Sequence, residues 1–349
     1  MTYIQNIATS SPKNKHSQSD LLAFMQSSTR EGMHRQRKLL NIIYKNSGID
    51  YRHSVIPDLY KYFLNTTVPN VEDRMDLFEK EALPLSLEAI DKCITKEQLS
   101  KITHIITVSC TGISAPGLEI DIISALGLSN KIVRTAVNFM GCYAAFHGLR
   151  IADQICKSDE NAEVLLVDVE LCSIHFQNEF DDDNILANSL FADGAAAVHL
   201  SAERNKNSKF ELIGFDSRLA LSGKAEMAWK ITPLGFKMKL SNYVADIIRD
   251  DIKGLLDDVI EERNLDRNKL NWAFHPGGVK ILNTIAAAIG VDKSELQTSY
   301  DILKENGNMS SVTVLFVLKS LIDKKTKGPI FSAGFGPGLT MEAMTLNQF

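Results

Sequence analysis

The chain has 349 residues, 44% of them hydrophobic, which is enough to bury a sizeable core in two ordinary domains or in one large duplicated unit. Its 38 Lys and Arg residues against 43 Asp and Glu residues leave a net charge of -5, which excludes the basic surface that nucleic acid or anionic lipid would need. No apolar run approaches the roughly 18 residues of a membrane span, and the N-terminus lacks a secretory signal pattern, so we expect a cytoplasmic protein without nucleic-acid or membrane partners.

The first clear elements lie in the first half of the chain. ITHIITVSC (102–110) is rich in β-branched residues and predicts a buried strand, and TGISAPG (111–117) predicts a loop. Helical spacing follows in 119–127 and again in 141–157, and AEVLLVDVE (162–170) predicts a second strand. Strands and helices that alternate in this way indicate an α/β fold.

The second half repeats this order. LNWAFH (270–275) predicts a strand that ends in a Pro-Gly-Gly turn, helical spacing follows in 279–290 and 308–323, and PIFSAGFG (329–336) predicts the last strand. Both halves therefore follow the order strand, loop, helix, helix, strand, which predicts one plan used twice. We place the N-terminal half at residues 1–205 and the C-terminal half at residues 206–349.

The cysteines do not form a pattern that would suggest a structural role for sulfur. They are odd in number, scattered and never spaced as Cys-x-x-Cys, which argues against both a disulfide framework and a zinc site. We therefore expect reduced thiols and no bound metal. The five residues are Cys93, Cys110, Cys142, Cys156 and Cys172.

Three polar residues stand at equivalent places in the two halves. Cys142 opens a predicted helix in the first half, and Asn308 precedes the matching helix in the second. His275 ends the strand that matches the one ending near Cys110. We expect these side chains to converge where the halves meet. Because the N-terminus of a helix favours a thiolate and can receive an oxyanion, Cys142 is a candidate nucleophile.

His147 is the nearest histidine in the sequence but is poorly placed to be the base. Residues five apart on a helix are rotated by about 140° from one another, so His147 would point away from Cys142. His275, which leaves an apolar strand into a tight turn, is the better candidate. Each residue also has an ordinary structural explanation when it is taken alone, since Cys142 could be a small buried hydrophobe and Asn308 a helix N-cap.

Taken together, the motifs resemble those of the type III polyketide synthases, the chalcone-synthase-like branch of the thiolase superfamily. The resemblance runs from about residue 38 to the C-terminus. It implies a thiolase-like αβαβα layered fold made of two duplicated halves, a homodimer, acyl-CoA and malonyl-CoA as substrates, and no metal or prosthetic group. The motifs that carry it are, in chain order, CTG, MGCYAAFHGLRIA, FADGAAA, AFHPGG, GNMSS and GFGPGLTME.

The resemblance also implies a role for each member of the triad. Cys142, held as a thiolate beside protonated His275, would attack the thioester of a starter acyl-CoA. His275 and Asn308 would bind the malonyl-CoA carbonyl and stabilise the charge that forms when CO2 leaves. The resulting carbanion would extend the acyl chain on Cys142 by two carbons, and repeated extension would end in ring closure.

Further positions match residues that bind substrate in the resembling family. Phe191 and Phe236 match its two aromatic gatekeepers, and Gly336 and Pro337 would shape the cavity through their backbone. Lys38 and Lys45 match two of three basic positions that contact the CoA phosphates. The third position is Asn41 in this chain, and a solvated helix face explains such a charge run equally well.

Four residues depart from the plant pattern and bear on the product. Cys110 replaces a hydroxyl residue, Cys172 and His175 replace two cavity threonines, and Met227 replaces a glycine. We therefore expect an aliphatic acyl-CoA or malonyl-CoA itself as starter, and a pyrone, resorcinol or polyhydroxy aromatic product. Cys110 could be a second reactive thiol, although simple packing is the expected role.

Three alternatives share parts of this pattern. A ketoacyl synthase III-like enzyme, which performs one condensation, has the same Cys, His and Asn but usually lacks the GFGPG ending. A hydroxymethylglutaryl-CoA synthase needs a glutamate base near the thiol, and Glu170 has no clear claim to that role. A non-catalytic scaffold with the thiolase fold would be expected to have lost a triad residue, and none is lost here.

Overall fold

The computed structural model describes residues 1–64, 67–241 and 243–349 of the chain. Nine strands of these residues form one hydrogen-bonded sheet that crosses the whole molecule. In spatial order they are β11 (Asn271–Phe274), β12 (Gly328–Gly336), β13 (Thr340–Gln348), β8 (Phe210–Leu219), β1 (Thr2–Ser10), β7 (Asp193–Ser201), β6 (Glu163–Leu171), β4 (His104–Ser109) and β5 (Val133–Asn138).

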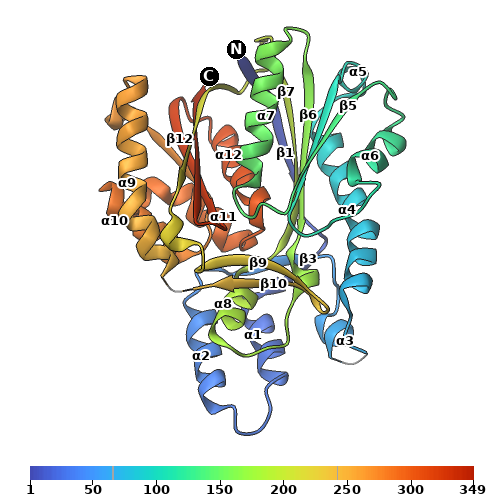
Figure 1. The fold of residues 1–349 in the computed structure, drawn as a ribbon, viewed down its shortest axis with the longest axis vertical. Coiled ribbons are helices and arrows are strands. Elements are labelled where there is room, and N and C mark those ends of the chain that lie inside the picture. The colour runs from blue at the N-terminus through green and yellow to red at the C-terminus, as the bar shows by residue number, and fades with distance from the viewer. Residues whose placement is uncertain (65–66, 242) are drawn as a thin grey trace.

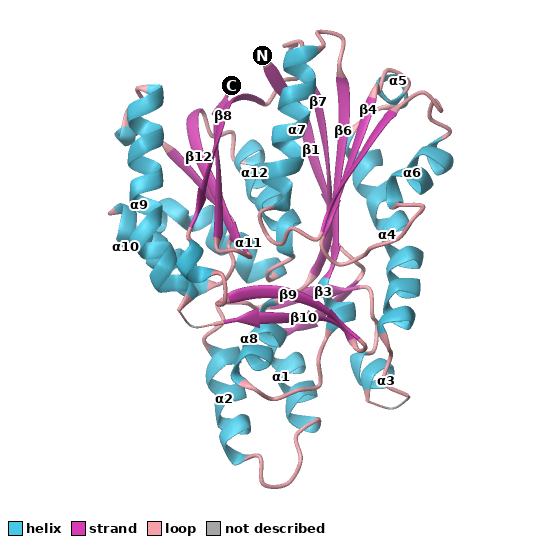
Figure 2. Cartoon of the chain, in the orientation of Figure 1, coloured by secondary structure: helices cyan, strands magenta, loops and turns pink. Residues whose placement is uncertain are grey.

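The sheet bends so that its two ends become separate layers, with helices between and outside them (Figure 1). The ends are joined by a short pairing of Thr2–Ile4 with Phe210–Leu212. The central helices are α7 (Ala144–Ser158) and α12 (Thr313–Asp323). The outer helices are α4 (Val71–Cys93), α5 (Lys96–Leu99) and α6 (Leu118–Leu126) on one side and α9 (Val244–Arg263) and α10 (Val279–Ile289) on the other. The result is the predicted αβαβα arrangement (Figure 2).

Strand β6 shows why these layers form. Its sequence is a nearly continuous apolar run, as expected for a strand that is covered on both faces. Because successive side chains of a strand point to opposite faces, Val164 and Leu166 pack around the central helices while Leu165 and Val167 pack against the outer helices α4 and α6. Asp168 and Glu170, near the end of the strand, are the buried ionisable exceptions.

Strand pairing confirms that the fold uses one plan twice. In the first half β4 and β6 are parallel, while β6–β7 and β7–β1 are antiparallel. In the second half β11 and β12 are parallel, while β12–β13 and β13–β8 are antiparallel. The halves differ between their two helices, because β5 lies there in the first half and helix α11 (Gln297–Asn306) in the second. The boundary at residues 205 and 206 stays a prediction.

A smaller group of elements covers one end of both halves, below the layers in Figure 1. Its strands β9 and β10 form an antiparallel hairpin, and β2 and β3 form another pair. The group consists of β2 (Asn14–Ser17), α1 (Gln18–Ser27), α2 (His34–Lys45), β3 (Tyr51–Ser54), α3 (Leu59–Phe63), α8 (Asp182–Leu190), β9 (Met227–Thr232) and β10 (Gly235–Leu240).

The predicted elements need two corrections. The helix expected from residue 141 begins at Ala144, so Cys142 lies in the turn before it. The helix expected from residue 308 begins at Thr313, after a short 3-10 turn over Ser310–Val312. Within the described residues, no helix combines the length and the apolarity needed to cross a bilayer.

Candidate active site

A deep cavity of about 320 Å³ brings together three residues that are far apart in the sequence. Cys142, His275 and Asn308 all contribute to its lining, and they are 6%, 1% and 3% exposed. The rest of the lining is mainly aliphatic and comes from α8, α9, α10 and the β9–β10 hairpin. The three side chains thus line one cavity, as expected from their places in the two halves.

The turn that carries Cys142 is held by close backbone contacts. Gly141 has φ +93°, and a Cβ on it would lie 2.4 Å from Pro337 Cδ, so only glycine fits. The Gly141 N–H donates to Cys110 Sγ at 2.9 Å. This turn ends β5 and leads directly into α7, so the thiol stays close to a helix N-terminus, as the sequence predicted.

Burial controls the charge of Cys142 and His275. It raises the pKa of the Cys142 thiol to about 12, and the hydrogen bond from the Ser310 hydroxyl opposes this shift only partly. Burial also lowers the pKa of His275 to about 3. Both shifts oppose the expected thiolate–imidazolium pair, which stays a prediction. Burial thus favours the neutral form of each of these two groups.

His275 lies directly after β11, and its backbone is fixed while its ring is not. The His275 N–H donates to Ala333 O at 2.8 Å, which continues the pairing of β11 with β12. Neither ring nitrogen has a hydrogen-bond partner among the described residues. Because no contact fixes the tautomer, either nitrogen can carry the proton.

The amide of Asn308 has a fixed orientation. Its Oδ1 accepts from the Ser310 N–H at 2.9 Å, and its Nδ2 donates to Gly277 O at 3.2 Å. An amide nitrogen has two hydrogens, so the second one is available in the cavity. The backbone of Asn308 pairs with Phe191, which holds both residues at the same wall. This amide is a fixed donor, as a site for a developing negative charge requires.

His147 takes no part in this arrangement. Its Nε2 lies 3.3 Å from Glu342 Oε1, and its ring packs beside Tyr143. The helical geometry that argued against His147 as the base of Cys142 is thus consistent with the structure. Across the described parts of the chain, no three His, Cys, Asp or Glu side chains are grouped so that they could hold a metal ion.

Two models of known protein families match the chain and together cover nearly all of it. The N-terminal domain of chalcone and stilbene synthases matches residues 2–204, and the C-terminal domain matches residues 217–349. The chain belongs to the chalcone and stilbene synthase family. It is a type III polyketide synthase and therefore an acyltransferase, which favours the main prediction over a single-condensation ketoacyl synthase, a hydroxymethylglutaryl-CoA synthase or an inert scaffold.

Individual relatives agree over nearly the whole chain. The alpha-pyrone synthesis polyketide synthase-like Pks18 of Mycobacterium tuberculosis is 28% identical, over 98% of this chain and 90% of that protein. PKS-I of the brown alga Ectocarpus siliculosus superposes with a TM-score of 0.91 at 26% identity, over 100% of this chain and 98% of that one. The C-terminal type III domain of Steely1 from Dictyostelium gives 0.91 at 26% identity, over 99% of both chains.

Several of the residues that were predicted to bind substrate line two separate cavities. Phe191 and Met227 line the triad cavity, whereas Cys172, His175 and Phe236 line a second cavity beside it. Both Phe191 and Phe236 therefore stand at walls of the site, although only Phe191 lines the same space as the triad. We call the first space the triad cavity and the second the side cavity.

Other predicted positions are not in the lining of either cavity. Gly336 packs against the Tyr143 ring and Pro337 against Gly141, so both support the Cys142 turn from outside, and Phe335 lines the triad cavity in their place. Lys38 and Lys45 lie exposed on α2 and line neither space. The position of a residue in a motif could not show whether it lines the cavity or supports the turn that carries Cys142.

Cys110 behaves as a packing residue of the synthase. It is 2% exposed, and its sulfur accepts the Gly141 N–H and lies 3.4 Å from Gly141 O. Burial raises its pKa well above the ordinary value, which disfavours a reactive thiolate. Cys110 thus holds the turn of the candidate nucleophile.

Sequence reasoning missed most of the lining, and two of the missed residues bear directly on function. Met238 lines both cavities, and Lys280 lies at the mouth of the triad cavity. Met238 could have been found, since β9 and β10 read MAWKIT and GFKMKL, the alternation typical of a half-buried hairpin. Lys280 follows the Pro-Gly-Gly turn on the exposed start of α10, and no sequence pattern singles it out.

A buried pair of carboxyl groups lies beneath the Cys110 turn. Ser311 Oγ is 2.8 Å from Asp168 Oδ1 and 2.7 Å from Glu170 Oε1, yet a hydroxyl has only one proton to donate. Glu170 also accepts from the Cys110 N–H and the Thr111 hydroxyl, at 2.9 and 2.8 Å. Asp168 Oδ2 has no partner among the described residues. Asp168 is therefore the protonated member, and Glu170 carries the charge that holds residues 110 and 111.

This assignment predicts a pH dependence of stability. Burial and then the Glu170 charge raise the pKa of Asp168 well above its ordinary value, so the folded protein keeps a proton that the unfolded chain loses. Stability therefore falls as the pH rises from the ordinary Asp range towards the raised pKa, by about 1.4 kcal/mol per pH unit for one proton. In Asp168→Asn, urea unfolding at several pH values should show a shallower fall. An unchanged slope would mean that Asp168 is already ionised in the folded protein.

Proposed function

We propose that Cys142 carries the acyl chain of this synthase and that His275 is its base. The cavity that joins Cys142, His275 and Asn308 is the observation that supports this. Since burial favours the neutral form of both the thiol and the imidazole, the thiol proton passes to a His275 ring nitrogen as the sulfur attacks the starter thioester. The new S–C bond forms, the bond to CoA breaks, and the departing CoA thiolate takes the proton from His275.

The same histidine and Asn308 then serve malonyl-CoA. A His275 N–H and the second Asn308 Nδ2 hydrogen bind the thioester oxygen, which receives the electron pair when the C–CO2 bond breaks. The enolate carbon attacks the acyl thioester on Cys142, the acyl C–S bond breaks, and the cysteine sulfur leaves as a thiolate that takes a proton from solvent water through the neutral His275 ring. Every charge in this sequence is received by an N–H donor or a ring nitrogen, so we propose that the reaction needs no metal and no prosthetic group.

We propose an aliphatic acyl-CoA as the starter and an α-pyrone as the main product. The triad cavity is lined by aliphatic side chains such as Leu240, Val244 and Ile248, with Met227 narrowing it, which suits a flexible chain better than a bulky ring. Alpha-pyrone synthesis is in the name of Pks18. A malonyl-CoA starter, and a resorcinol or polyhydroxy aromatic product, are the alternative outcomes.

One assay tests this function directly. Purified protein is incubated with [14C]malonyl-CoA and acyl-CoA starters from acetyl-CoA to palmitoyl-CoA, and the products are separated and identified by mass. We expect CO2 release and labelled pyrones with aliphatic starters. Absence of both with every starter would rule the proposal out, and a labelled resorcinol would correct the product alone.

We propose that CoA enters between α2, α9 and α10, with Lys280 as its main cationic contact. Lys280 and Asn46 line both the triad cavity and a shallow basin outside it, to which Arg249 also belongs. These groups surround the mouth through which a thioester reaches Cys142. Phosphate groups outside the mouth would meet positive charge here.

Lys280→Ala is therefore expected to raise KM for malonyl-CoA by about tenfold, the effect of one charge-assisted hydrogen bond. The KM for malonyl-pantetheine, which lacks the nucleotide phosphates, should hardly change. Lys293→Ala, a lysine that lines neither cavity, is the matched control and should resemble the wild type for both substrates. An equal rise for both substrates in Lys280→Ala would contradict a phosphate contact.

We also propose that the synthase forms a homodimer in the cytoplasm. β5 is an edge strand of the sheet, and Val133 on it and Ile113 near it are 53% and 42% exposed, so this edge offers apolar surface to a second copy. The five cysteines are unpaired, which suits a reducing compartment where CoA esters are made.

A further inference from the structure

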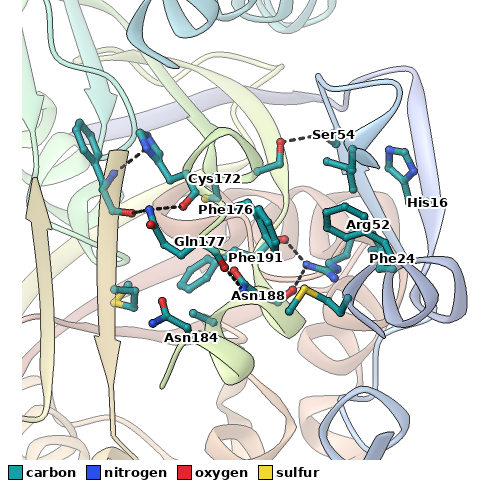
Figure 3. Close-up of a pocket in the computed structure, with 18 of the residues that line it drawn as sticks. His16, Phe24, Arg52, Ser54, Cys172, Phe176, Gln177, Asn184, Asn188 and Phe191 are labelled. Atoms are coloured by element: carbon teal, nitrogen blue, oxygen red, sulfur yellow. Dashed lines mark hydrogen bonds between the residues drawn. The ribbon is translucent and has the colours of Figure 1, made fainter. Parts of the chain in front are cut away.

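The triad cavity and the side cavity are neighbours that share only two lining residues. The side cavity measures about 70 Å³ and lies behind Phe191 and Met238, which line both spaces. Its other lining includes His175 and Trp229, together with Cys172, which is labelled in Figure 3. Phe191 and Met238 therefore form the partition between the candidate nucleophile and this second space.

The β9–β10 hairpin places Met238 at the partition. Directly opposed residues of an antiparallel pair lie on the same face, and Met238 opposes Trp229 while Leu240 opposes Met227. This face runs along both spaces, with Leu240 and Met227 in the triad cavity and Trp229 in the side cavity. On its own strand, Met238 lies between Leu240 of the triad cavity and Phe236 of the side cavity.

The side cavity suits an apolar ligand because its polar side chains are already bonded to the protein. His175 Nε2 donates to Thr111 O at 2.7 Å, and its Nδ1 accepts from the Phe236 N–H at 3.0 Å. Figure 3 shows further bonds of this kind, in which Arg52 donates to backbone carbonyl groups and Asn188 donates to Gln177 O. A polar ligand would have to break these bonds, whereas an alkyl chain would not.

Met238 is the part of this wall that can move. Phe236 is stacked on the His175 ring with centroids 4.1 Å apart, and the Trp229 indole N–H donates to Cys110 O at 2.8 Å. The backbone on both sides of Phe191 is tied to Asn308. Methionine has three rotatable side-chain bonds and no ring to be stacked, so it adapts to a new neighbour at little cost.

We propose that Met238 is a specificity-determining partition: its rotation lets the distal end of an aliphatic starter on Cys142 pass from the triad cavity into the side cavity, and its size thereby sets the starter length that the synthase accepts. The inference rests on the proposed acyl loading of Cys142. The side cavity holds the tail of the starter, and the polyketide grows on the triad side.

The test compares kcat/KM across starters from butyryl-CoA to palmitoyl-CoA in two opposite variants. Met238→Ala should move the optimum to longer chains and raise kcat/KM for the longest starters by about tenfold, the effect of one or two additional buried CH2 groups. Met238→Phe should move the optimum to shorter chains. Lys239→Ala, on the opposite face of the same strand, should leave the profile as in the wild type.

Two results would overturn the proposal. One is that kcat/KM depends on starter length in Met238→Phe as it does in the wild type. The same result in Met238→Ala would count equally, provided that thermal unfolding shows this variant to be folded. The other is a change in the number of malonyl units with no change in starter preference. If the wild type itself loads no acyl group, then the proposed function has failed, which is a different result from loading that Met238 does not influence.

Discussion

Replacing Cys142 with alanine stops acyl loading and lowers product formation by about a thousandfold or more, while malonyl-CoA is still decarboxylated. Loading needs a sulfur that forms a thioester, and alanine has none. Decarboxylation needs only the donors that hold the thioester oxygen, His275 and Asn308, and the small Ala side chain leaves them in place. The intact mass of the protein after incubation with an acyl-CoA measures loading, and CO2 release from malonyl-CoA measures the second step.

Cys110→Ala is the matched control, because Cys110 is buried near Cys142 and is also a cysteine. It loses the contacts of the Cys110 sulfur with Gly141 and should therefore slow the reaction moderately, yet it should still gain the mass of the acyl group. If Cys110→Ala failed to load and Cys142→Ala loaded normally, the assignment of the nucleophile would be wrong.

Asn308→Ala is expected to lower decarboxylation of malonyl-CoA by about a hundredfold to a thousandfold, because a fixed donor to the developing enolate is lost. Acyl loading should persist, since the thiol and its base are unchanged. Asn308→Asp should be at least as slow: it keeps an acceptor for the Ser310 N–H but loses the donor and places a negative charge beside the enolate. CO2 release from malonyl-CoA and the mass of the loaded protein separate the two steps.

Asn306→Ala provides the control for the Asn308 variants. Asn306 ends the preceding helix, where its Nδ2 donates to Ile302 O, and it lines neither cavity. It should decarboxylate malonyl-CoA like the wild type. Decarboxylation at the wild-type rate in Asn308→Asp would show that this side chain does not receive the enolate charge.

The elements with strong local patterns could be predicted from the sequence. β4 and β6 are mainly apolar, although Asp168 and Glu170 interrupt β6. α6 and α10 end at Gly127 and Gly290, which adopt the left-handed conformation that stops a helix. β1 was not anticipated, because its partners β7 and β8 lie far away in the sequence. β13 was not anticipated either: it follows β12 directly, but its other partner, β8, is also far away in the sequence. Local pattern does not encode such pairing.

The site shows the same limit. The meeting of Cys142, His275 and Asn308 followed from their equivalent places in a repeated plan, so topology was enough to predict it. The effect of burial on Cys142 was not predictable, since a helix N-terminus favours the thiolate while burial, visible only in the fold, raises the pKa of the thiol. The sequence likewise could not show that Met238 faces two spaces, because this depends on how the β9–β10 hairpin lies across both halves.

The contact of Gly141 with Pro337 joins one copy of the repeated plan to the other at the candidate nucleophile. The position after the first parallel strand holds Cys110 in one copy and His275 in the other, so the two copies have divided the chemistry between them. The candidate site therefore belongs to neither copy alone, because Cys142 comes from one and His275 and Asn308 come from the other. A substitution at Pro337 in one half would therefore disturb Gly141, the neighbour of Cys142 in the other half.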